Sequence, residues 1–143
     1  MNYFAACVAL IFALLWHSHQ AEAETLTVKL SGLHPGAGVV RVMLWKDGTG
    51  FPTQVDKAVA HKVLVVTGPE LEFSFTGLAR GTYAAGGYQD ENNNGNMDRS
   101  LLGWPVEPTA ASNGARGMLG PPSFSAAAFE LKQPSQIIQL IFK

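Results

Sequence analysis

Hydrophobic and polar residues alternate with a period of two along much of this chain. Near its start, Leu26, Val28 and Leu30 alternate with polar residues, which is typical of a strand buried on one face. Six further runs are rich in β-branched or aromatic residues and are bounded by Gly, Pro or Asp. They are residues 39–45, 58–66, 71–75, 82–88, 123–131 and 136–142. We therefore predict seven strands and little helix, with residues 126–128 as one possible helical turn.

Seven short strands separated by turns indicate a single all-β domain, an antiparallel β-sandwich of immunoglobulin or transthyretin type. Aromatic residues in strands usually pack between the sheets, so we expect them in the core. These residues are Phe73, Phe75, Tyr83, Phe129 and Phe142. Trp45 ends its strand, and it either joins this core or caps one end of the sandwich.

A stretch of more than thirty residues between Tyr88 and Ser123 shows little regular pattern. It is much longer than the usual connection in a sandwich, and its apolar content argues against disorder. We predict one long ordered loop, in which residues 101–122 form a lid beside one end of the sandwich. Trp104, Met118 and Leu119 then either present a binding surface or merely cover a sheet edge. A shorter connection, residues 46–56, reads as an ordinary surface loop.

The first residues predict export. The apolar run 4–16 is shorter than the roughly 20 residues of a membrane-spanning helix, and Ala21-Glu22-Ala23 is a small-x-small cleavage pattern. We predict a cleaved signal peptide at residues 1–23 and one domain at residues 24–143, periplasmic or secreted. Because Cys7 lies inside the apolar run and not at the cleavage site, no membrane anchor is expected after cleavage.

Composition excludes several classes of partner. Without residues 1–23, 120 residues remain, with no cysteine and with ten acidic and ten basic residues. A domain of this size buries a sufficient core without disulfides. No basic stripe is present, so neither nucleic acid nor an anionic membrane is predicted as a partner from the charge pattern.

An Asn-rich run carries the candidate chemistry. Asp90, Asn92, Asn94 and Gly95 match the D-x-[DN]-x-[DN]-G pattern of a calcium loop. Such a cation needs about six to eight oxygen ligands, and alternate side chains of a tight loop can supply them. Gly95 permits the positive φ of the turn. Two further ligands are expected, the peptide carbonyl of Asn96 and the carboxylate of Asp98.

The twelfth position of the loop is Leu101, which cannot ligate. Glu107 is our candidate for the missing carboxylate, and Glu91 ranks second because alternation points it outward. We expect weak affinity, with a dissociation constant of about 10⁻⁴ to 10⁻³ M. The alternative is a metal-free polar turn, since Asn, Asp and Gly are the commonest turn formers.

Little else in the domain suggests catalysis. His34 and His61 have no partners at ligand spacing, and Ser112 and Ser123 lack a G-x-S-x-G setting. We therefore predict that the protein is not an enzyme, and a hydrolase is the weakest of the alternatives.

Four motifs occur in a defined order along the domain. They are Gly-Leu-Ala-Arg-Gly-Thr-Tyr-Ala at residues 77–84, the Asn-rich run at 90–98, Leu-Gly-Trp-Pro-Val-Glu-Pro at 102–108, and Ser-Asn at 112–113 with Gly-Pro-Pro-Ser-Phe at 120–124. In these motifs the chain resembles the DUF2141 family of exported bacterial proteins of unknown function. It departs from that family at residues 109–111, where Thr-Ala-Ala replaces an aromatic Tyr-Gly-Phe.

The first motif also resembles the transthyretin-like and Cna-B modules. That resemblance implies a turn feeding a central strand, with Leu78 closing the sandwich end and Tyr83 in the core. The sequence as a whole predicts a calcium-stabilised accessory or binding module of the cell envelope, whose partner is an unidentified envelope protein or glycan. The alternative is a purely structural sandwich with a metal-free turn.

Overall fold

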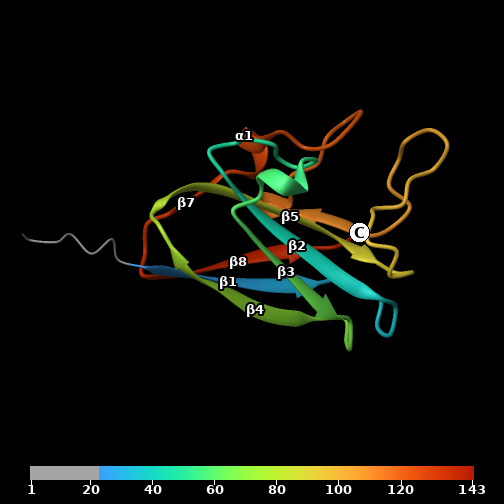
Figure 1. Cartoon of the computed structure of the whole chain (residues 1–143), viewed down its shortest axis with the longest axis horizontal. Coiled ribbons are helices and arrows are strands. Elements are labelled where there is room, and N and C mark those ends of the chain that lie inside the picture. The colour runs from blue at the N-terminus through green and yellow to red at the C-terminus, as the bar shows by residue number, and fades with distance from the viewer. Residues whose placement is uncertain (1–22) are drawn as a thin grey trace, which may run out of the picture.

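The computed structural model describes residues 23–143, which form two β-sheets packed face to face (Figure 1). The prediction of an all-β sandwich is confirmed. The expected signal peptide lies outside the described residues, apart from Ala23. No helix among the described residues is long and apolar enough to cross a bilayer.

The smaller sheet has three strands, with β1 (Glu24–Ser31) between β4 (Leu71–Leu78) and β8 (Ser135–Ile141). β1 and β4 are antiparallel, but β1 and β8 are parallel, where the sequence predicted antiparallel strands throughout. β8 enters this sheet from the other one beside the start of β1, where the Thr25 N–H donates to the Pro134 carbonyl at 3.0 Å. The two strands therefore run in the same direction.

The larger sheet is antiparallel and has five strands. Its order is β3 (Ala60–Val65), β2 (Val39–Lys46), β5 (Gly81–Asp90) and β6 (Thr109–Ala111), and β7 (Phe129–Leu131) also pairs with β5. β5 is long enough to hold β7 along its first residues and β6 near its end. The end of β5 is where the candidate metal loop begins.

The core lies between the two sheets. Leu26, Val28 and Leu30 of β1 face this layer, as the alternation predicted, and the inward residues of β2 face it from the other side. Four of the five predicted core aromatics are buried, and Phe129 is partly buried against them. Leu78 and Tyr83 take the core positions that the first motif implied. Each large apolar side chain buried here contributes about 1.5–3 kcal/mol.

The larger sheet is also buried on part of its outer face. Alternation along β2 points Met43 and Trp45 away from the core, and Tyr88 of β5 joins them. The ring of Phe51 packs edge-to-face on Trp45 at 5.3 Å, and the Trp45 indole N–H donates to the Gln54 carbonyl at 3.0 Å. Two expectations were therefore wrong. Trp45 neither joins the main core nor caps a sandwich end, and residues 46–56 are a covering segment, continued by the 3₁₀ turn η1 (Val55–Lys57).

The long stretch after β5 is interrupted by regular structure. β6 pairs with β5, and it is followed by the 3₁₀ turn η2 (Ser112–Gly114). The predicted single lid over residues 101–122 is therefore wrong, and two loops replace it, loop A (residues 91–108) and loop B (residues 115–123). The expected strand at 123–131 also divides, into the helical turn α1 (Phe124–Ala127) and β7.

The Ser-Asn motif explains why this region stays against the sheet. The buried hydroxyl of Ser112 accepts the Ala85 N–H at 3.0 Å and lies 2.5 Å from the Ala127 carbonyl, to which it donates. Asn113 has a φ of 59° and donates from its amide to the Ala128 carbonyl at 2.8 Å. The motif thus joins η2 to β5 and to the end of α1.

Candidate metal loop and binding hollow

Asp90, the last residue of β5, is fully buried and is the base of loop A. Its Oδ2 accepts hydrogen bonds from Arg41 Nε and from the Gly95 N–H, both at 2.9 Å, and its Oδ1 accepts the Asn94 N–H at 3.0 Å. Burial alone would raise the pKa of Asp90, but the Arg41 guanidinium and the two backbone N–H groups hold that pKa below its ordinary value of 3.8. Asp90 is therefore a carboxylate at neutral pH.

The side chains of loop A converge on Asp98. The amide groups of Asn92 and Asn94 donate to the two Asp98 carboxylate oxygens at 2.6 and 2.8 Å. The amide oxygen of Asn92 accepts the Asn94 N–H at 3.1 Å, and that of Asn94 accepts the Asn96 N–H at 2.8 Å. Gly95 has a φ of 82°, as the sequence predicted for this turn.

Glu107 lies against the same loop and is buried. One carboxylate oxygen accepts the Glu91 N–H and the other accepts the Asp98 N–H, both at 2.9 Å. Glu107 thereby holds the two ends of the Asn-rich run together. Its service as a metal ligand stays a prediction, as does that of Glu91, whose side chain instead accepts a hydrogen bond at 2.6 Å from Nδ1 of His34.

The residue types of loop A fit a hard cation, but their present orientation does not. Asp90 and Asp98 supply carboxylate oxygens, and an oxygen that accepts one hydrogen bond keeps a second lone pair for a ligand bond. Asp90 Oδ1 and both Asp98 oxygens meet this condition, whereas Asp90 Oδ2 already accepts two hydrogen bonds. The Asn92 and Asn94 amides, however, direct N–H groups at Asp98, which is where a cation would lie. Among the described residues, no three His, Cys, Asp or Glu side chains are grouped to hold a metal. A cation here would depend on both amides turning their oxygens inward.

Loop A contains a short hairpin. Arg99 and Pro105 form a β-bridge, and the Ser100 N–H donates to the Trp104 carbonyl at 2.8 Å. One residue outside the bridge on each strand, the Val106 N–H donates to the Asp98 carbonyl at 3.0 Å. Asp98 therefore connects the ligand cluster, through its own backbone, to the segment that carries Trp104.

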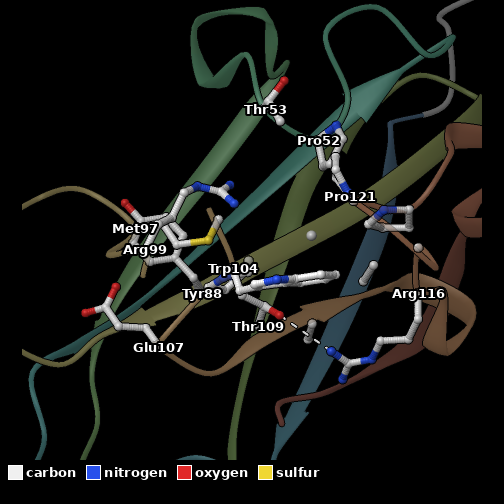
Figure 2. A pocket seen from close by; sticks show the side chains of 18 of the residues that line it. Pro52, Thr53, Tyr88, Met97, Arg99, Trp104, Glu107, Thr109, Arg116 and Pro121 are labelled. Carbon is white, nitrogen blue, oxygen red and sulfur yellow. Dashed lines mark hydrogen bonds between the residues drawn. The ribbon is translucent and has the colours of Figure 1, made fainter. Parts of the chain in front are cut away.

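Beside the loop, the outer face of the larger sheet is hollowed. The hollow has a volume of about 810 Å³, and Met43, Trp45 and Tyr88 are among the side chains that line it. Trp104, Arg99 and Arg116 also line it, and in Figure 2 the Trp104 ring lies between the two arginines. The Tyr88 hydroxyl donates to the Gly95 carbonyl at 3.1 Å, so the floor of the hollow and loop A are joined directly. Burial raises the pKa of Tyr88 and keeps this donor protonated.

The three predicted binding residues do not share one position. Trp104 from loop A and Leu119 from loop B line the same hollow, whereas Met118 is exposed and lies outside it. The Trp104 side chain is 48 % exposed, in contrast to Trp45, which is 0 % exposed. Trp104 therefore lies at the rim of the hollow.

Sequence reasoning missed four residues of this region. Arg41 is the polar member of an alternating strand, and nothing in the sequence indicated that it faces Asp90. Gln89 is fully buried and binds both the N–H and the carbonyl of His34. Arg99 and Arg116 each precede an apolar pair by two positions, and this repeated pattern was a signal that could have found them.

The matched family covers most of the chain. Residues 28–139 match the family described as DUF2141, "Uncharacterized protein conserved in bacteria", and no curated protein matches the chain. Among solved structures, an alternative pilotin from the type II secretion system of Vibrio cholerae is similar, with 14 % sequence identity and a TM-score of 0.41. The match covers 85 % of this chain and 97 % of the pilotin chain, and at this level of similarity it carries no argument about function. On the extent of the family match and the order of its motifs, the chain belongs to the DUF2141 family.

Proposed function

We propose that this protein is an exported, non-catalytic binding module of the cell envelope, in which calcium stabilises the loop that carries the binding surface. The observation that supports this most is the apolar hollow on the outer face of the larger sheet, with a half-exposed Trp104 at its rim. Concave apolar sites with a few polar groups are the usual form of a binding site. An envelope protein or glycan is the partner expected from the sequence.

The link between cation and binding surface runs through Asp98. Its side chain meets the Asn92 and Asn94 amides, and its backbone N–H and carbonyl bind Glu107 and Val106. A cation held by the Asp98 carboxylate would hold the base of the Arg99–Pro105 hairpin in place. Trp104 would then be presented with less loss of loop entropy on binding.

A non-catalytic role is supported by the state of the acidic groups near the hollow. Glu107 is the acidic side chain among the lining residues, and both its oxygens accept backbone N–H groups. A general acid or base needs a free position toward the substrate. Both oxygens of Glu107 are instead used to hold loop A together.

The second candidate is a purely structural sandwich with a metal-free turn. One observation favours it: Asn92 and Asn94 already satisfy both oxygens of Asp98 with N–H donors. Under this alternative the loop is complete without calcium. A single titration separates the two candidates.

The deciding experiment is thermal unfolding with and without about 10 mM calcium. Because a site assembled only in the fold links binding to stability, a hundredfold excess over the dissociation constant gives about 2.7 kcal/mol. We expect calcium to raise the melting temperature of the wild type and of Asp56→Asn, an exposed control, but not of Asp98→Ala. An unchanged melting temperature of the wild type would reject calcium binding and leave the metal-free turn.

A further inference from the structure

At its tip, each of loops A and B carries two consecutive apolar side chains that face solvent. Leu101 and Leu102 of loop A are 107 % and 85 % exposed, and Met118 and Leu119 of loop B are 93 % and 90 % exposed. Single exposed apolar residues are ordinary on a protein surface, but adjacent pairs at two loop tips are not explained by packing.

The two tips lie on one face of the molecule. Leu102 and Leu119 line the same hollow from opposite loops. Figure 1 shows loop A, in yellow to orange, and loop B, in orange to red, projecting on the same side of the molecule, away from the smaller sheet. The two tips are therefore separate apolar projections on either side of one hollow.

Three basic side chains line the hollow between the tips. Arg99 and Arg116 line the hollow with Lys143, and the one acidic residue of the lining, Glu107, is buried. The Arg99 guanidinium donates to the Gly103 carbonyl at 2.9 Å, and that of Arg116 to the Ile141 carbonyl at 3.4 Å. Neither arginine forms an ion pair with a carboxylate among the described residues. The lining of the hollow therefore carries more basic than acidic side chains, although the chain as a whole has a formal charge of −1.

We propose that the tips of loops A and B dock on a lipid bilayer surface that carries anionic headgroups. This inference rests on the proposed binding role of the same face, and it puts a lipid surface in place of the envelope protein or glycan expected from the sequence. Aliphatic side chains flanked by arginines match the order of layers in a bilayer, with apolar chains below anionic headgroups. Trp104, half-exposed in the lining of the hollow, is of the residue type enriched at that interface.

The shape of the surface favours a bilayer over a folded protein partner. Two separate convex tips would each need a matching pocket on a protein, placed at the right separation. A fluid lipid surface admits both tips without preformed pockets. Insertion to about 5–10 Å, the usual depth of interfacial segments, suffices to bury such side chains and to bring arginines to the phosphates.

The test is co-sedimentation with vesicles, using the chain from Ala23, which contains the whole described fold and lacks the apolar segment 4–16. Vesicles of phosphatidylethanolamine with phosphatidylglycerol are compared with vesicles of phosphatidylcholine alone. We expect binding to the anionic vesicles that weakens with salt, and a blue shift of the Trp104 emission. The blue shift should be absent in Trp104→Phe, because Trp45 is already buried.

Two sets of variants make the test specific. Changing both residues of one tip, Leu101→Ser with Leu102→Ser or Met118→Ser with Leu119→Ser, should reduce the vesicle partition constant about tenfold or more. The matched control is Val65→Ser with Ile137→Ser, two exposed apolar residues outside the lining of the hollow, and it should bind as the wild type does. Arg99→Gln with Arg116→Gln should weaken binding to the anionic vesicles only.

Three results would overturn the inference: no binding by the wild type, equal binding by the tip variants, or an equal loss in the control. Binding to a soluble peptide or glycan without vesicle binding would assign the face to that partner and also reject the bilayer. The calcium-dependent melting temperature is measured on the same samples. A calcium shift without vesicle binding rejects only the bilayer, so the failure of this inference is distinct from the failure of the proposed function.

Discussion

The carboxylate of Glu107 accepts the backbone N–H of Asp98 at 2.9 Å and, through its other oxygen, the N–H of Glu91 at the same distance. A single buried side chain thus closes the Asn-rich run between its second and last residues. The bond to Asp98 matters most for the proposed function. It fixes the residue that connects the candidate ligands to the hairpin bearing Trp104.

We expect Glu107→Gln to destabilise the protein by about 1–3 kcal/mol, because a carboxamide has one acceptor oxygen and must place an NH₂ group against a backbone N–H. Urea unfolding monitored by circular dichroism measures the loss. The matched control is Glu72→Gln, whose exposed carboxylate is paired with Lys29 at 3.8 Å, and it should change the free energy of unfolding by less than about 0.5 kcal/mol. Equal losses in the two variants would show that Glu107 does not hold the loop.

The pKa of Asp90 makes part of the stability depend on pH. Burial by itself would raise this pKa, but the Arg41 guanidinium and the Gly95 and Asn94 N–H groups bring it below 3.8 in the fold. A carboxylate with a depressed folded pKa contributes stability that is present above its unfolded pKa and is lost as the pH falls through the folded pKa. We therefore expect the stability difference between the wild type and Asp90→Asn to be largest at neutral pH and to shrink in acid below about pH 4.

Urea unfolding of both proteins across this acid range provides the measurement. Asp56→Asn is the control, since the Asp56 side chain is exposed and lies 3.7 Å from Lys57 at the surface. The control should show no comparable dependence on pH. A constant difference between the wild type and Asp90→Asn down to the lowest pH would contradict the prediction.

The two tryptophans of the described fold offer a matched comparison. Trp45 is fully buried under Phe51, whereas Trp104 is half-exposed at the rim of the hollow. We expect Trp45→Ala to reduce the free energy of unfolding by about 3–5 kcal/mol, as for other large truncations in a core. Trp104→Ala should reduce it by less than about 1 kcal/mol. If Trp104→Ala proves as costly as Trp45→Ala, Trp104 is a covering residue and not part of a binding surface.

Local pattern determined most of the sandwich. Leu26, Val28 and Leu30 are buried as their alternation predicts, and β1 begins and ends within one residue of the alternating run. The turn at Gly95 and the convergence of Asn92 and Asn94 on Asp98 also follow from local spacing, because short polar side chains interact within a few residues of themselves. These features need no information from distant parts of the chain.

Pairing between distant segments could not be predicted from the sequence. β6 is only three residues long, and its place is set by β5 on one side and by the backbone of Lys143 on the other. For the same reason, the parallel pairing of β1 with β8 has no local signature. The burial of the outer face under Phe51 could not be predicted either. The alternation shows which residues of a strand point outward, but not whether water or a covering loop lies above them.

The sequence by itself determined the class of fold, the composition of the Asn-rich loop and the two adjacent apolar pairs, since each depends on neighbours in the chain. Only the tertiary structure decided that Arg41 meets Asp90, that Glu107 returns to Asp98, and that Arg99 and Arg116 lie at one hollow. The physical reason is that these contacts join residues brought together by strand pairing. The local sequence around a charged residue does not indicate which distant residue it will contact.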